Sequence, residues 1–205
     1  METAPIKITR HVHACVEIAY KDSLLIIDPG SFGAPDLSGA TILFTHNHPD
    51  HLDPAILDKS MEIYAPRSVA HQLNIEVHIV DHGHTFNVGD FRIEVVGSQH
   101  ARLLHSQGLG ENIGYLINGR VLHPGDAFQP IKGVELALLP VNGPWLKMLD
   151  IEEYLKKYPP LNFIGIHDGI VNDYGLAINK KFLTLLGAEH NSNYVPLKVG
   201  ESFQI

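Results

Sequence analysis

The sequence predicts an α/β fold in which two β-sheets pack face to face and helices cover their outer sides. Short segments with strand-like patterns outnumber helical ones along the whole chain. Two of them, "SLLIIDPG" and "VELALLP", contain continuous apolar runs, which are typical of strands buried on both faces. Helical segments are interspersed among the strands, and stacked layers of sheet and helix bury the apolar faces of such a set.

The expected elements of the first half follow from local patterns. The segment 11–20 alternates apolar and polar residues as a strand does, and a tight turn at Lys21-Asp22 leads into the buried run. The next strand, "TILFT", runs straight into a histidine cluster. Asp53 and Pro54 then fit the N-cap and first position of a helix over 54–59. The remaining expected elements here are strands at 61–66 and 76–80 and a helix at 67–74.

The second half continues the alternation of strand and helix. Asn118-Gly119 predicts a hairpin between two short strands. Asp150 and Glu153 have the spacing of a capping box at the start of a helix over 150–158, and Gly187 is expected to end a helix over 179–187. The expected strands of this half are 91–100, 113–117, 120–126, 134–140 and 162–169.

Length and composition limit the domain organisation and the partners. The 205 residues suit one domain over 1–205 and are too few for two ordinary ones. Asp and Glu number 23 against 15 Lys and Arg, which gives a net charge of −8. Because the basic residues are scattered, no positive track for nucleic acid is expected, and a small-molecule substrate fits better.

The expected location is the cytoplasm. No apolar run reaches the roughly 20 residues that span a bilayer, so no membrane partner is expected. The N-terminal stretch lacks the pattern of a signal peptide. The single cysteine, Cys15, has no partner within the chain for a disulfide. Nothing in the sequence predicts the oligomeric state.

The stretch "FTHNHPDHLD" holds three histidines and two aspartates in ten residues. In an extended segment the i, i+2 spacing lets His46 and His48 face one way. Pro49 then bends the chain, so that Asp50 and His51 can face a second point. One short loop can thus serve two metal ions, although it cannot complete a site for either.

Three further residues supply what this loop lacks. His100, Asp126 and His167 each follow a separate predicted strand. Loops at strand ends are where a rigid scaffold usually places functional groups. Each of the three has an ordinary structural reading by itself, but four strand ends that all close on His or Asp indicate a metal centre.

In this frame the chain resembles the metallo-β-lactamase superfamily. Its H-x-H-x-D-H motif stands here as "HNHPDH", preceded by Asp28 after a buried strand and followed in order by His100, Asp126 and His167. The resemblance implies a four-layer αβ/βα sandwich with the metals at one edge between the sheets. The blocks "HACVEI", "VLHPGDAF" and "LALLPVNGPW" are similar to those of the branch that contains ascorbate-6-phosphate lactonase.

The resemblance also implies a role for each residue. The first metal would be held by His46, His48 and His100, the second by Asp50, His51 and His167, and Asp126 would bridge the two. Asp50 and His167 are expected to take part directly in catalysis. Asp28 would orient the ligand loop from behind the ligands, and His13 is a second candidate for such an outer contact.

The ligand set suits two divalent metal ions, zinc first, with manganese or iron as alternatives. Two such ions about 3.5–4 Å apart can share a hydroxide that attacks a carbonyl or phosphorus. The expected activity is therefore hydrolysis of a small ester-like substrate: a lactone, a phosphodiester or an amide. The alternatives are an iron-dependent oxidoreductase on the same scaffold, a nuclease and a non-catalytic binding module.

Candidates for the substrate pocket lie in two loops. The stretch "ARLLHSQGLGEN" after His100 is either a substrate-side loop, with His105 near the metals, or an ordinary surface loop. In "VNGPWLKM", Asn142 and Trp145 are expected at the pocket mouth, although Trp is also a common packing residue. His82 and His84 repeat the H-x-H spacing, but they have no partners of their own, so an exposed turn is expected there.

Overall fold

The computed structural model describes residues 4–205, which form two seven-stranded mixed sheets with helices on their outer sides. The first sheet has the order β14-β1-β2-β3-β4-β5-β6 and the second β13-β12-β11-β10-β9-β8-β7. The strands of the first sheet are β1 (Ile6–Arg10), β2 (Val16–Tyr20), β3 (Ser23–Ile27), β4 (Thr41–Leu43), β5 (Ile63–Ala65), β6 (His78–Ile79) and β14 (Ser202–Gln204). Those of the second are β7 (Thr85–Val88), β8 (Phe91–Val96), β9 (Gly114–Ile117), β10 (Val121–His123), β11 (Leu136–Pro140), β12 (Asn162–Ile166) and β13 (Asn193–Tyr194). The helices are the 3-10 turn η1 (Pro54–Ile56), α1 (Arg67–Ala70), α2 (Met148–Lys157) and α3 (Asp173–Glu189).

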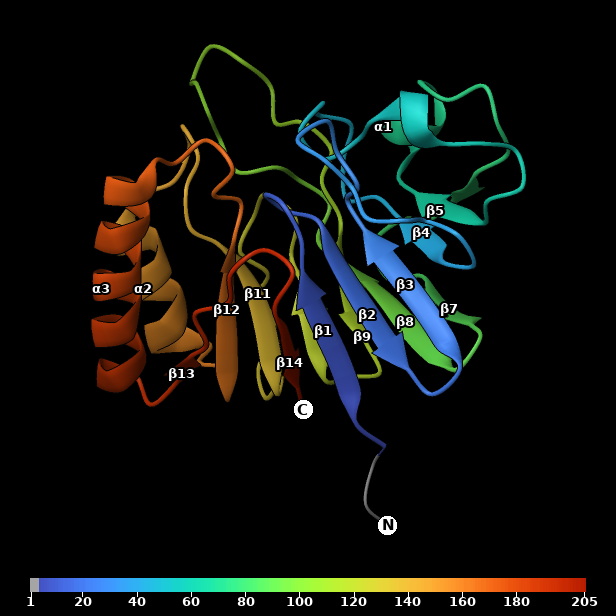
Figure 1. The fold of residues 1–205 in the computed structure, drawn as a ribbon. Coiled ribbons are helices and arrows are strands. Elements are labelled where there is room, and N and C mark those ends of the chain that lie inside the picture. The colour runs from blue at the N-terminus through green and yellow to red at the C-terminus, as the bar shows by residue number, and fades with distance from the viewer. Residues whose placement is uncertain (1–3) are drawn as a thin grey trace.

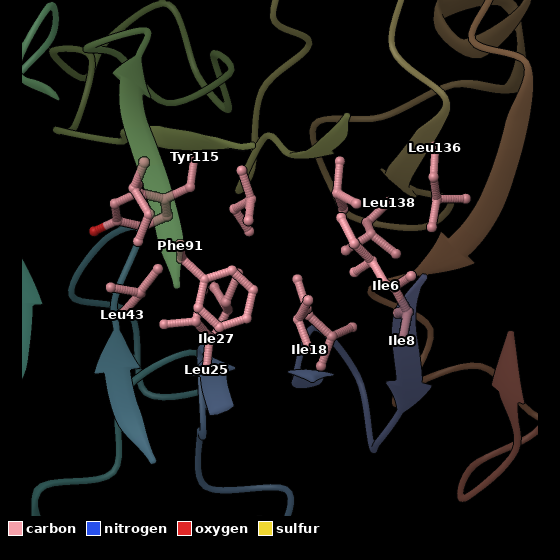
Figure 2. Packing of buried hydrophobic residues seen from close by; sticks show 14 of the residues in the cluster. Ile6, Ile8, Ile18, Leu25, Ile27, Leu43, Phe91, Tyr115, Leu136 and Leu138 are labelled. Carbon is pink, nitrogen blue, oxygen red and sulfur yellow. The ribbon is translucent and has the colours of Figure 1, made fainter. Parts of the chain in front are cut away.

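Three apolar cores separate four layers, as the predicted sandwich requires. The largest lies between the sheets (Figure 2), and the others lie outside the first sheet and between the second sheet and helices α2 and α3. Alternate residues of β3 belong to two of these cores: Leu25 and Ile27 point into the central core, whereas Ile26 points into the core outside the first sheet. Strands buried on both faces are therefore continuously apolar, as the sequence indicated.

Strand direction brings the ends of several strands to one edge. β1 and β3 both run antiparallel to β2, and β3 and β4 are parallel. In the other sheet β10, β11 and β12 are parallel, and β8 runs the same way because both β8 and β10 are antiparallel to β9. The loops that leave these strands gather at the top of Figure 1, opposite the chain termini.

All four expected helices differ from the observed ones, and the helix expected over 67–74 ends already at Ala70. The segment 54–59 forms only η1, although Asp53 is its N-cap and accepts from the Ala55 N–H at 3.0 Å. Helix α2 begins earlier than predicted, and the Asp150 carboxylate reaches back to the Lys147 N–H at 2.7 Å, so Asp150 is the third helical residue rather than the cap. Helix α3 begins at Asp173 and passes through Gly187, where a Cβ would lie 2.6 Å from the Ser192 carbonyl oxygen, so this glycine serves close packing.

The N-terminal strand prediction was wrong in part. Residues 11–15 form a tight turn instead of strand, closed by the His11 N–H on the Cys15 carbonyl at 2.9 Å. The segment Ile6–Arg10 is a strand that the pattern did not reveal, and it pairs with β14 from the C-terminal end. This turn matters because it carries His13 to the edge where the other loops gather.

Candidate metal centre

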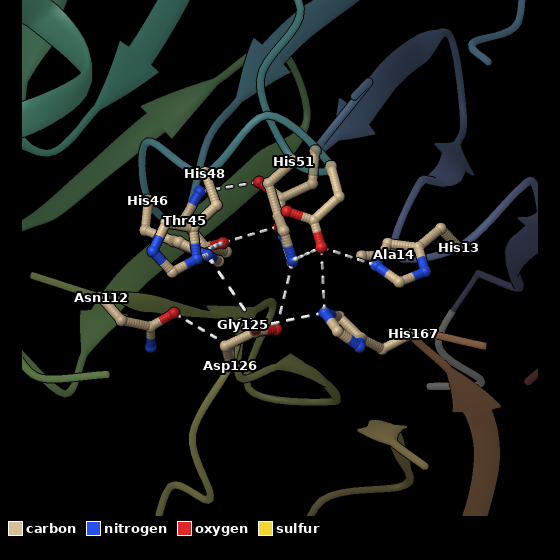
Figure 3. A network of polar contacts seen from close by, with 12 residues as sticks. His13, Ala14, Thr45, His46, His48, His51, Asn112, Gly125, Asp126 and His167 are labelled. Atoms are coloured by element: carbon tan, nitrogen blue, oxygen red, sulfur yellow. Dashed lines mark hydrogen bonds and ion pairs between the residues drawn. The ribbon is translucent and has the colours of Figure 1, made fainter. Parts of the chain in front are cut away.

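The loop after β4 carries the "HNHPDH" stretch to this edge, where its side chains meet those of four other loops (Figure 3). His46, His48, His100 and Asp126 form one group, in which one ligand atom from each lies within 4.8 Å of the others. His48 is exposed, while the other three are buried. The structure thus brings together residues from three strand ends that the sequence predicted to meet.

A second group joins Asp50, His51 and His167 to His13, again within 4.8 Å of one another. Asp126 links the two groups. Its Oδ1 lies 3.2 Å from His51 Nε2, and its Oδ2 lies 3.1 Å from His167 Nε2 and 3.3 Å from His100 Nε2. A carboxylate between two sets of imidazoles is the arrangement expected of a bridging ligand.

Four buried polar atoms at the centre lack hydrogen-bond partners among the described residues. They are the Nε2 atoms of His51, His100 and His167 and Oδ1 of Asp126. Buried polar atoms are normally paired, and an unpaired one costs about 1–3 kcal/mol. A convergent set of imidazole nitrogens and carboxylate oxygens fits divalent cations, which would satisfy all four atoms at once.

The far nitrogens of two histidines are fixed by backbone carbonyls. His100 Nδ1 donates to the Ala101 oxygen, and His167 Nδ1 donates to the Asn142 oxygen, both at 2.6 Å. A protonated Nδ1 leaves the Nε2 lone pair of a neutral imidazole free for a metal ion. Asn142 was expected at the pocket mouth, and the structure gives its carbonyl this orienting contact.

Asp28 supports the ligand loop from beneath. Its Oδ2 accepts from His51 Nδ1 at 2.8 Å and from the Thr45 hydroxyl at 2.6 Å, and its Oδ1 accepts from the Thr45 N–H at 2.7 Å. The Thr45 oxygen in turn lies 3.0 Å from His46 Nδ1. Both His46 and His51 therefore present Nε2 to the centre. The sequence analysis did not predict a role for Thr45, because a threonine at the end of a strand has no distinctive pattern.

His13 differs from His100 and His167 in which ring nitrogen carries the proton. Its Nδ1 accepts from the Gly169 N–H at 2.9 Å, so in the neutral ring the proton sits on Nε2, which lies 3.0 Å from Asp50 Oδ2. His13 therefore donates to the carboxylate instead of offering a lone pair to a metal. Its burial, outweighing the attraction of Asp50, lowers the pKa of His13 and favours this neutral form.

The backbone is strained where three of these residues enter the site. His13, Asp28 and His167 have φ values of 61°, 51° and 64°, in the left-handed region. Each non-glycine residue held there costs of order 1–3 kcal/mol, and such residues cluster at functional sites. The turn after each strand is thereby bent so that the side chain faces the neighbouring loops.

Close backbone packing holds the ligand loop in place, and no pattern in the sequence indicated it. A Cβ on Gly30 would lie 2.0 Å from the Asp50 carbonyl oxygen, and the Ser31 N–H donates to the Pro49 oxygen at 2.9 Å. Only glycine permits this approach. The segment after β3 therefore supports "HNHPDH" both through Asp28 and through its own backbone.

Two further residues, which the sequence analysis did not predict, position candidate ligands. The buried side chain of Asn112 accepts from the Asp126 N–H at 2.8 Å and donates to the Pro124 oxygen at 3.1 Å. The buried guanidinium of Arg10 forms an ion pair with Asp168 and donates to the Gly165 oxygen at 3.2 Å. These contacts fix the turns that carry Asp126 and His167.

Burial and neighbouring charges shift the pKa values of His167 and Asp126 in opposite directions. Burial tends to lower the pKa of His167, but Asp126 and Asp50 outweigh it and raise that pKa to about 9. Burial tends to raise the pKa of Asp126, but the surrounding histidines hold it well below its usual range. The raised pKa favours a proton on the His167 imidazole, and metal binding must displace such a proton.

The candidate ligands differ in their exposure to solvent. Asp50 has a side chain that is 29% exposed, whereas Asp126 is 4% exposed. The Trp145 ring borders the centre, with its centroid 5.6 Å from that of His100 and 6.0 Å from that of His167. His105 lies exposed on the loop after His100, and no described contact joins it to the two groups.

Comparison with known proteins agrees with this geometry. Residues 7–162 match the Beta-lactamase superfamily domain. The chain is 32% identical over 181 residues to Protein Rv0786c of Mycobacterium tuberculosis, covering 81% of this chain and 85% of that one.

Solved structures of low sequence identity share the fold. Igni18, a metallo hydrolase from Ignicoccus hospitalis, has a TM-score of 0.75 at 16% identity, over 98% of both chains. The isothiocyanate hydrolase from Delia radicum gut bacteria has a TM-score of 0.74 at 16% identity, over 96% of this chain and 98% of that one. CmlA, a diiron β-hydroxylase from Streptomyces venezuelae, has a TM-score of 0.69 at 15% identity, over 100% of this chain and 55% of that one. With two helix-flanked sheets and His/Asp groups at their shared edge, the chain belongs to the beta-lactamase superfamily and has the metallo-β-lactamase fold.

Proposed function

We propose that the protein is a metal-dependent hydrolase of small ester-like substrates. The observation that carries this proposal is the convergence of unpaired Nε2 atoms from His51, His100 and His167 on the carboxylate of Asp126. The structural similarity to Igni18 and to the isothiocyanate hydrolase supports the reaction type. Lactones, phosphodiesters and amides are the substrate classes we put forward, and the sequence blocks similar to the lactonase-like branch support lactones.

The proposed ligands are the seven expected from the sequence. They are His46, His48 and His100 for one ion, Asp50, His51 and His167 for the other, and Asp126 between them. Zinc is proposed first, with manganese or iron as alternatives. When bound, such ions polarise the attacked oxygen and lower the pKa of water to about 7.

The other proposed roles, orientation of the ligands and catalysis, belong to different side chains. Asp28, Thr45 and the carbonyls that face His100 and His167 hold the imidazole nitrogens in the ligating tautomer. Asp50 and His167 are proposed to take part in catalysis. The Asp50 carboxylate is fixed by the Nε2–H of His13 and is partly open to solvent, so it can accept a hydrogen bond from the water that attacks the substrate.

Reconstitution of the purified chain tests this proposal. Chelator-treated protein is loaded separately with Zn²⁺, Mn²⁺ or Fe²⁺ and assayed on a lactone series, bis(p-nitrophenyl) phosphate and an anilide, with metal content measured in parallel. We expect up to two ions per chain and turnover that chelation abolishes. Tight binding of metal without turnover of any of these substrates would contradict the proposal.

An iron-dependent oxidoreductase is the second candidate, supported by the similarity to the diiron β-hydroxylase CmlA. Iron in freshly purified protein, with oxygen uptake and no hydrolysis, would favour it.

A nuclease is less well supported, because the net charge of −8 opposes binding of a polyanion. We also propose a small-molecule substrate and a cytoplasmic location, which the single, buried Cys15 supports. None of the helices between residues 4 and 205 has the length and apolar character needed to cross a membrane.

A further inference from the structure

A cleft of about 380 Å³ begins at the wall of the metal centre. Ala101 and Trp145 line it. The Ala101 carbonyl accepts from His100 Nδ1, and the Trp145 ring stands edge-on to the rings of His100 and His167. A molecule that reached the centre beside Trp145 could therefore extend a substituent into this cleft without leaving the protein surface.

Aromatic rings form much of the cleft. Phe128 and Tyr154 are stacked with their centroids 5.0 Å apart, and Tyr158 follows Tyr154 at 5.8 Å. The Tyr154 hydroxyl is shielded from solvent, so this residue presents ring carbons rather than its polar atom. Aromatic faces and edges favour binding of other rings and of apolar chains.

The polar residues of the cleft disfavour an anionic guest. Asp150 and Glu153 line it together with Lys157, and a second cation, Lys132, lies outside the lining with its Nζ 6.0 Å from the centroid of the Tyr158 ring. Lys157 Nζ lies 3.4 Å from Glu153 Oε2, so its charge is already partly matched. The remaining negative charge would repel a carboxylate or phosphate placed among the rings.

We propose that this cleft binds an uncharged aromatic or apolar substituent of the substrate, next to the bond that the metal centre cleaves. The inference rests on the proposed hydrolase function. The volume agrees with it, because a cavity of about 150 Å³ holds benzene and this cleft has room for about two rings. The site would thus select neutral substrates with a bulky apolar group over small or doubly charged ones.

A binding experiment tests the cleft without turnover. Trp145 is the only tryptophan in the chain, so intrinsic fluorescence reports on the cleft directly. Metal-free protein is titrated with 4-phenylbutan-1-ol and with 4-phenylbutyrate, which differ in charge. We expect a saturable change with the alcohol and several-fold weaker binding of the carboxylate. Phe128→Ala should lower the binding affinity for the alcohol about tenfold, which is the scale of losing one buried ring contact.

Phe182→Ala on helix α3 is the matched control, because this phenylalanine is 43% exposed and does not line the cleft. A second variant, Glu153→Lys, changes a side chain that is 72% exposed and so should preserve folding. It is expected to bring binding of phenylbutyrate close to that of the alcohol. Equal effects of the two Phe→Ala variants, no saturable signal, or an unchanged charge preference in Glu153→Lys would overturn the inference.

Turnover separates the inference from the proposed function. With metal-loaded enzyme, kcat/KM should be at least about tenfold higher for a phenyl-substituted γ-lactone than for γ-butyrolactone, and Phe128→Ala should remove most of this preference. Hydrolysis of both lactones at the same rate would overturn the cleft assignment and leave the hydrolase proposal standing. Saturable binding of the alcohol without hydrolysis of any substrate would support the cleft and count against the proposed function.

Discussion

Two stretches of the chain share the H-x-H spacing and have opposite fates. His46 and His48 leave the interior strand β4 and meet residues from other loops at the metal centre. His82 and His84 enter the edge strand β7 through an exposed turn, where His84 Nδ1 only accepts from the Asp81 N–H at 3.1 Å. The spacing alone therefore does not make a metal site. Position in the sheet decides whether partners from other strands are within reach.

The largest expected effect comes from removing the residue that joins the two groups. Asp126→Ala leaves the Nε2 atoms of His51, His100 and His167 without their common carboxylate. We expect loss of most bound metal and a fall in kcat of about 10³-fold or more, the scale of losing a principal electrostatic group. Metal analysis and steady-state kinetics measure both quantities. Full metal content in this variant would show that Asp126 is not a ligand.

Removing the support beneath the loop should have a smaller effect. In Asp28→Asn an amide replaces one of the two oxygens that accept from Thr45 and His51. We expect metal affinity to fall about 10- to 100-fold, as for other outer-shell partners of ligating histidines. Competition with a calibrated chelator measures it. Asp90→Asn on the surface is the matched control, and an equal loss there would contradict the assigned role of Asp28.

Close packing at Gly30 gives the third test. Gly30→Ala places a Cβ 2.0 Å from the Asp50 carbonyl oxygen, so the ligand loop must shift. We expect the free energy of unfolding to fall by about 1–3 kcal/mol, the usual cost of overpacking, and metal affinity to fall with it. Gly108→Ala is the control, because a Cβ there meets no described atom within 4 Å. Equal melting temperatures for the two variants would argue against this packing role.

The second H-x-H stretch should tolerate change. A double variant, His82→Ala with His84→Ala, removes two exposed imidazoles that meet no other candidate ligand among the described residues. Its stability should stay within about 0.5 kcal/mol of the parent, as for most surface changes. Its metal content should be unchanged. Loss of an ion would mean that the contrast between the two stretches is false.

The sequence was sufficient for the layers and for the order of residues around the centre. Continuous apolar runs marked strands buried on both faces, and His or Asp after successive strands marked the shared edge. These signals are local, so they are visible in one dimension. The exposed turn at His82 and His84 was likewise predicted and is confirmed.

The contacts that orient the ligands depend on distant parts of the chain. His13 acquires its protonation state from the backbone of Gly169, which lies 156 residues away. Gly30 and Asn112 owe their roles to loops that approach only after folding. Helix boundaries failed for a similar reason, because tertiary packing at Gly187 overrides the usual helix-ending tendency of glycine.

The left-handed backbone at His13, Asp28 and His167 implies a conflict between robustness and activity. Each residue holds a conformation that glycine adopts freely, so replacement by glycine would release strain that the active chain retains. Release of this strain therefore comes only with the loss of a side chain that the site uses. A screen for more heat-resistant variants of this protein therefore has to measure turnover as well as melting temperature, because inactive variants would otherwise be selected.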